Sequence, residues 1–87
     1  MMRAARVDAN QKAIVDALRA CGCSVYVLGL PLDLLVGRQG KNYLLEIKTG
    51  PKARLTEFQQ DFRATWQGQW ARVNTIDEAF KVVGLLK

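Results

Sequence analysis

The chain has 87 residues, 49% of them hydrophobic, so it can bury one modest core, and we expect a single domain over residues 1–87. Thirteen Lys and Arg against eight Asp and Glu give a net charge of +5, which favours a polyanionic partner. The absence of histidine excludes nucleases that use it as a base or metal ligand, together with Ser-His and Cys-His nucleophile systems. Any hydrolytic chemistry must therefore come from carboxylates, lysine and a metal ion.

The two cysteines and the N-terminus carry no sign of export. Cys21 and Cys23 are separated by a single residue, too close for an ordinary disulfide, and they have no histidine partners for a structural zinc. We interpret them as small apolar residues at a helix end. No run is long enough to span a membrane, and Met1 to Arg6 lacks the apolar core of a signal peptide. The expected location is the cytoplasm, without membrane contact.

The first third of the chain predicts a helix and a short strand. Asp8 can cap a helix that runs to about Ala20 and stops at Gly22. Apolar residues at three-to-four spacing form its buried stripe: Ile14, Val15, Leu18 and Cys21. Ser24–Leu28 then has the composition of a strand, and Gly29 marks a break.

A hairpin follows. Leu32–Val36 and Asn42–Lys48 are apolar runs of strand length, joined through Gly37–Lys41. If Gln39-Gly40 is the two-residue turn, Asp33 lies directly opposite Glu46. The Cβ atoms of such a pair are about 5 Å apart on one face of the sheet.

The last third of the chain predicts a helix, a strand and a helix. After a basic loop at Thr49–Arg54, Thr56 caps a helix with an apolar stripe of Phe58, Phe62 and Trp66. Trp70–Val73 forms a further strand, and Thr75–Glu78 has the Thr-x-x-Glu form of a capping box that opens a helix through about Val83. The predicted order is α, β, β, β, α, β, α.

Asp33, Glu46 and Lys48 form the candidate chemical constellation. Two carboxylates at one end of a buried hairpin repel each other unless a cation lies between them. A divalent ion with oxygen ligands meets this need, and Lys48, two residues after Glu46, can hold a water molecule or stabilise developing phosphorane charge. The alternative is a strand-end ion pair between Glu46 and Lys48, with Asp33 a turn residue near Pro31.

The sequence also resembles a known nuclease family over most of its length. The segments that carry the likeness are Leu32–Gly37, Gly40, Leu45-Glu46-Ile47-Lys48-Thr49, Leu55-Thr56, Gln59, Phe62 and Trp66. They are similar to the VRR-NUC type of PD-(D/E)XK nucleases, most closely to the short stand-alone phage and prophage forms. The resemblance implies an α/β, restriction-endonuclease-like α-β-β-β-α-β core with a C-terminal helix. It also implies Mg²⁺- or Mn²⁺-dependent phosphodiester cleavage by homodimers acting on branched DNA such as Holliday junctions, in a bacterial or phage-infected cell.

Carried over position by position, the resemblance assigns five site residues. Asp33 and Glu46 match the metal-binding acids, the carbonyl of Ile47 a further ligand, and Lys48 the catalytic lysine. Gln59 matches a helix glutamine next to the active site. Gln59 is also the last residue of a Thr56-x-x-Gln capping box, so it can equally serve its own helix start.

Two features depart from the family pattern. Leu32 separates Pro31 from Asp33, whereas the family proline directly precedes its acid. Many relatives also have a metal-binding glutamate in the first helix, and here Asn10 and Gln11 occupy that neighbourhood. Both are neutral oxygen donors, so we expect weaker metal binding and a raised metal requirement if either is replaced by alanine.

Cations and aromatic residues near the predicted site are candidates for DNA contact. The basic residues are Arg38, Lys41, Lys52, Arg54 and Arg63, of which Lys52 and Arg54 directly follow the site strand. Solubility is the alternative role for all of them. Trp66 and Trp70 are able to stack on unpaired bases. Helical spacing instead favours a core position for Trp66.

Two rival functions and one assembly remain open from sequence. A catalytically weak nuclease fold serving as a DNA-binding subunit is the first rival, and a nuclease acting on RNA or single strands is the second. A two-fold dimer would bury more surface than so small a chain can bury alone, and would supply two sites for two nicks. Its candidate contact surface comprises Trp70, Phe80, Val83, Leu85 and Leu86.

Overall fold

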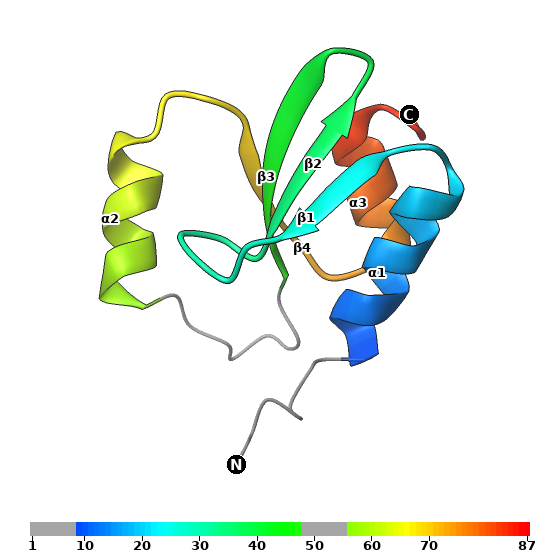
Figure 1. Ribbon diagram of the computed structural model, residues 1–87. Helices are drawn as coiled ribbons and strands as arrows, with labels where there is room; N and C mark the ends of the chain where they lie inside the picture. Colours follow the sequence, from blue (N-terminus) through cyan, green and yellow to red (C-terminus); the bar gives the residue numbers. More distant parts are fainter. Residues whose placement is uncertain (1–8, 48–55) are drawn as a thin grey trace.

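The fold is a four-stranded mixed sheet with helices on both faces (Figure 1). The computed structural model describes residues 9–47 and 56–87. Its elements are α1 (Ala9–Ala20), β1 (Ser24–Val27), β2 (Leu34–Arg38), β3 (Lys41–Ile47), α2 (Glu57–Thr65), β4 (Trp70–Val73) and α3 (Ile76–Val83). The strands lie in the order β1-β2-β3-β4, antiparallel except for the parallel pair β3 and β4. The α/β class and the predicted order of elements are confirmed.

The hairpin of β2 and β3 has the predicted register. Arg38 pairs with Lys41 and Leu34 with Leu45. Gln39 and Gly40 have φ values of 53° and 83°, the two positive φ angles that a type I′ turn requires. β2 begins at Leu34 and ends at Arg38, each two residues later than predicted. Just before it, the carbonyl of Asp33 accepts the N–H of Leu28 at 2.8 Å.

The core lies between one face of the sheet and the pair α1 and α3. Side chains alternate along the strands, so that Leu34 and Val36 of β2 and Tyr43, Leu45 and Ile47 of β3 all point to this face and are buried. The helices cover them with four fully buried side chains: Ile14, Leu18, Ala79 and Val83. The predicted stripe of α1 is confirmed except at Cys21, which is exposed.

The opposite face carries α2, and here the predicted apolar stripe is wrong. In Figure 1 this helix stands on the other side of the sheet from α1 and α3. Phe58 is 57% exposed and Trp66 is 44% exposed, whereas Gln59 is buried. The helix is turned so that a polar residue meets the sheet, because Gln59 finds a charged partner there, as described below. A stripe of three aromatic residues gave no sign of this.

The C-terminal helix is capped as its sequence indicates. Thr75 accepts the N–H of Glu78 (3.0 Å), while the Glu78 carboxylate accepts the N–H of Asn74 rather than that of Thr75 itself. Gly84 ends the helix in the left-handed conformation at φ 88°. Asp8, the predicted cap of α1, lies outside the described residues.

α3 contributes to the core more than expected. Val83 is fully buried, and Phe80 and Leu85 pack against the core. The predicted dimer surface is therefore wrong at Val83, whereas Phe80 and Leu85 are half-buried and Leu86 is exposed. The apolar side of α3 packs against the core of its own domain.

Both cysteines lie in the described part of the chain. Cys21 and Cys23 are both free thiols, and burial raises the pKa of Cys23, which fits a small apolar residue better than a reactive one.

Within residues 9–47 and 56–87, no helix has the length and apolar character needed to cross a bilayer.

Candidate active site

Asp33 and Glu46 meet at the end of the hairpin opposite its turn. Oδ2 of Asp33 accepts the N–H of Ile47 at 2.8 Å, and this N–H belongs to the peptide that joins Ile47 to Glu46. Glu46 lies one position beyond the Leu34–Leu45 pair, as the predicted register requires. Both acids are half-buried. The hydrogen bond fixes the Asp33 carboxylate beside Glu46 and leaves capacity for more partners, since a carboxylate has about four lone-pair sites.

Gln59 connects α2 to this pair of acids. Its Nε2 donates to Oε1 of Glu46 at 3.0 Å, while its Oε1 accepts the N–H of Thr56 at 3.1 Å. Thr56 in turn accepts the N–H of Gln59, which completes the capping box. Gln59 therefore contacts the acid pair and also completes the cap of its own helix, the two alternatives expected from sequence. The amide can do this because it has a donor end and an acceptor end, a property glutamate lacks.

β4 adds a residue that the sequence did not identify. Arg72 pairs with Glu46 in the parallel register of β3 and β4, and its side chain is half-buried. Paired residues of neighbouring strands point to the same face of a sheet, so the side chain of Arg72 leaves β4 on the face that carries Glu46. The useful signal was the strand-helix-strand order from β3 to β4, which is typical of parallel neighbours, but the pairing register is not encoded locally.

The donor set suits a hard divalent ion that is only partly coordinated by protein. In the described part of the chain, no three His, Cys, Asp or Glu side chains gather closely enough to hold a metal. Two carboxylates and the carbonyl of Ile47 are the oxygen ligands on offer. Magnesium is commonly bound through one or two carboxylates, with water and substrate phosphate as the other ligands. The chemistry of the residues therefore fits Mg²⁺ or Mn²⁺, with Lys48 outside the described residues.

The first-helix residues have other neighbours. Nδ2 of Asn10 donates to the carbonyl of Asn74 at 2.8 Å and so joins α1 to the loop before α3. Gln11 lies with Val15 and Val27 in a shallow hollow of about 370 Å³ between α1 and the end of β1. The structure thus gives Asn10 a structural contact, which is an alternative to the metal-binding role expected from sequence.

This contact changes the effect expected for Asn10→Ala. We expect the free energy of unfolding to fall by up to about 1 kcal/mol, the usual net value of one hydrogen bond. The concentration of Mg²⁺ needed for half-maximal activity should stay the same. Urea unfolding and metal titration of Asn10→Ala beside Gln11→Ala separate the two roles. A raised metal requirement at unchanged stability would restore the metal-binding interpretation.

The predicted DNA-contacting cations lie in different places. Arg38 and Lys41 flank the hairpin turn, at the far end of the strands from the acids, and Arg38 donates to the carbonyl of Val83 at 3.1 Å. Arg38 therefore caps the end of α3. The guanidinium of Arg63 lies 4.6 Å from the ring centroid of Trp70. Lys52 and Arg54 are outside the described residues.

The two functions of Gln59 predict a separation between stability and metal response. Thr56→Ala removes the N-cap and should cost about 1 kcal/mol of stability, with the Gln59–Glu46 contact kept. Gln59→Glu keeps the acceptor of the capping box but places a second carboxylate against Glu46. A bound cation relieves that repulsion, so adding Mg²⁺ should raise the Tm of Gln59→Glu more than it raises the Tm of the parent. Each additional kcal/mol of stabilisation by Mg²⁺ corresponds to a further rise of roughly 4–8 °C. If Mg²⁺ raises the Tm of the parent, Thr56→Ala and Gln59→Glu by the same amount, Glu46 does not belong to the metal site.

Comparisons with known protein families, with curated proteins and with solved structures find no match to this chain.

Proposed function

We propose that the chain is a metal-dependent DNA endonuclease with its reaction centre at Asp33, Glu46 and Lys48. The observation that supports this most directly is the hydrogen bond of Asp33 to the peptide that follows Glu46. It holds Asp33, which directly precedes β2, against the peptide that follows Glu46 of β3, and Gln59 of α2 also contacts Glu46. Two neighbouring carboxylates favour the binding of a cation between them.

Each residue has a defined task in the proposed reaction. Asp33, Glu46 and the carbonyl of Ile47 would hold Mg²⁺ or Mn²⁺, which when bound polarises a phosphoryl oxygen and lowers the pKa of bound water. Gln59 orients Glu46 through its amide donor. Lys48 would position the attacking water or stabilise the negative charge that develops on the phosphate.

DNA is the substrate we propose, in branched form, and cut by a homodimer. The net charge of +5 favours a polyanion, and two sites related by a two-fold axis match two opposing strands. β1 lies at the edge of the sheet, and exposed apolar residues lie at its end and just after it: Val27, Leu28 and Leu30. An exposed edge of this kind is suited to pairing with a second chain. Light scattering at micromolar concentration tests the dimer, which a mass near 9.7 kDa would exclude.

A cleavage panel tests the activity itself. The purified protein is incubated with plain duplex, single-stranded, flap and four-way-junction DNA, and with RNA of the same sequences, in Mg²⁺, Mn²⁺ or EDTA. We expect cleavage of branched DNA in either metal and none in EDTA. Binding without cleavage under all conditions would instead favour the DNA-binding subunit.

A further inference from the structure

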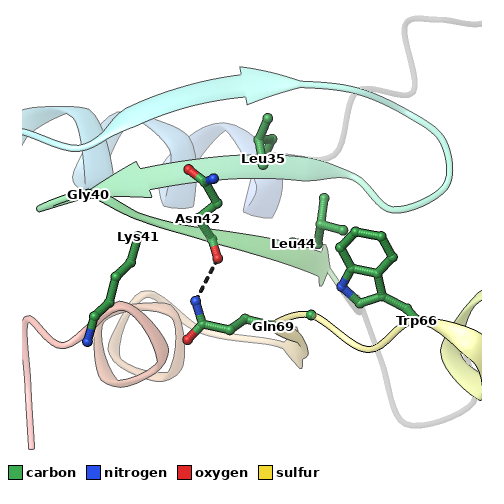
Figure 2. A pocket seen from close by; sticks show the side chains of 8 residues that line it. Leu35, Gly40, Lys41, Asn42, Leu44, Trp66 and Gln69 are labelled. Carbon is green, nitrogen blue, oxygen red and sulfur yellow. Dashed lines mark hydrogen bonds between the residues drawn. The ribbon is translucent and has the colours of Figure 1, made fainter.

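A groove runs along the same face of the sheet as the acids. It has a volume of about 580 Å³, and the residues that shape it include Leu35, Leu44, Asn42, Lys41, Trp66 and Gln69. Figure 2 shows Leu35 and Leu44 on the neighbouring strands, with the indole of Trp66 beside Leu44. This volume lies within the range of about 300–1,000 Å³ that is usual for sites binding small ligands.

Strand geometry connects this groove to the acid pair. Leu44 precedes Glu46 by two residues on β3, so the two side chains point to the same face about 7 Å apart. α2 lies beside the groove on this face, with Gln59 at Glu46 and Arg63 at Trp70. A nucleic acid strand with one nucleotide in the groove would therefore place a neighbouring phosphate at the acids, because successive phosphates of such a strand are separated by a similar distance.

The groove combines an apolar floor, an aromatic wall and amide groups. Leu35 and Leu44 form the floor, and Trp66 forms one end. Asn42 and Gln69 lie between them and Lys41, and Nε2 of Gln69 donates to the carbonyl of Asn42 at 2.8 Å (Figure 2). No Asp or Glu is among the described residues that line it. A base with a free face stacks on such an aromatic wall, and its edges suit the amides.

The indole of Trp66 is held in place rather than loosely exposed. It stacks on Phe62 with a ring-centroid distance of 5.1 Å and an interplanar angle of 20°. A Cβ atom added at Gly68 would lie 2.8 Å from three indole atoms, so the ring packs against this glycine. Trp66 nevertheless remains 44% exposed. A fixed, partly exposed aromatic ring loses little conformational freedom on binding.

We infer that this groove binds one unpaired nucleotide of the DNA strand that is cut, next to the scissile phosphate. This inference rests on the proposed nuclease function and narrows it to substrates with unpaired nucleotides at the cleavage point, such as flaps and open junctions. A base within a continuous duplex has both faces stacked and its pairing edge occupied, so blunt duplex cannot use the groove.

The test is binding in EDTA, where no cleavage intervenes. The full chain is titrated into fluorescein-labelled oligothymidylate and into a blunt duplex of equal length, with anisotropy as the readout. Trp66→Leu should weaken oligothymidylate binding about tenfold, the effect of losing one stacked base, and duplex binding less than twofold. The matched control is Phe58→Leu, which removes an exposed aromatic residue of the same helix away from the groove and should change neither.

A second measurement keeps the indole and moves it, should Trp66→Leu fail to fold. In a Trp70→Phe background, Trp66 is the sole tryptophan, and oligothymidylate should quench its emission. Gly68→Ala should reduce both the quenching and the affinity, because the added methyl group displaces the ring. Absence of quenching in the parent background would overturn the inference.

Other outcomes separate the groove from the enzyme. Equal losses on oligothymidylate and duplex would overturn the preference for unpaired nucleotides. A lower mass of Trp66→Leu in light scattering, with DNA affinity unchanged, would overturn it in favour of an interface between two copies. Binding through Trp66 without any Mg²⁺-dependent cleavage would support the groove and reject the nuclease. If Trp66→Leu binds and cleaves flaps with the parental affinity and rate, the nuclease is supported and the groove is rejected.

Discussion

Glu46→Gln and Asp33→Asn are each expected to reduce Mg²⁺-dependent cleavage by on the order of a thousandfold. Each substitution keeps the shape of the side chain and removes its charge. The amide oxygen at position 33 can still accept the N–H of Ile47, and the amide oxygen at position 46 can still accept a hydrogen bond from Nε2 of Gln59. What is lost is metal binding, which supplies several kcal/mol of transition-state stabilisation, and each 1.4 kcal/mol corresponds to a factor of ten in rate.

Three measurements make this expectation specific. In EDTA both variants should be at least as stable as the parent, because one of two repelling charges is gone. The rise in Tm on adding Mg²⁺ should disappear in both. The double variant should be no slower than either single variant, since residues that act as a unit are not additive. Asp61→Asn, an exposed acid of α2, is the matched control for loss of charge. Parental cleavage by Glu46→Gln would reject the site.

The sequence predicted the hairpin and the meeting of the acids because both follow from local rules. Gln39-Gly40 fits a two-residue turn, the turn sets the register, and the register brings Asp33 to Glu46. Thr56-x-x-Gln59 likewise predicted a capping box from four adjacent residues. In each case the partners are close in sequence or are related by a symmetric pairing that one turn determines.

The parts that were missed depend on contacts between distant segments. Nothing within α2 indicates that Gln59 rather than Phe58 faces the sheet, since the choice depends on a carboxylate of β3. The position of Arg72 beside Glu46 depends on a parallel register set by the crossover from β3 to β4. Trp66 was expected in the core because helical spacing cannot tell a buried stripe from one that borders a groove.

Lys48→Ala is expected to slow cleavage at saturating Mg²⁺ by about a hundredfold or more, the usual effect of removing one oriented electrostatic group. The metal concentration for half-maximal activity should not change, because the oxygen ligands at Asp33, Glu46 and Ile47 are intact. Lys48 lies outside the described residues, and the expectation rests on its place directly after Ile47 and on the family resemblance.

Two neighbouring substitutions distinguish a catalytic lysine from a nearby positive charge. Lys48→Arg keeps the charge but replaces a compact ammonium with a planar guanidinium, so it should recover only part of the lost rate. Lys52→Ala removes a charge from the same basic segment. It should weaken DNA binding, reduce the dependence of affinity on salt concentration by about one counterion, and leave the rate at saturating DNA unchanged. If Lys48→Ala instead behaves like Lys52→Ala, the lysine only attracts the substrate, and the two acids must activate water without it.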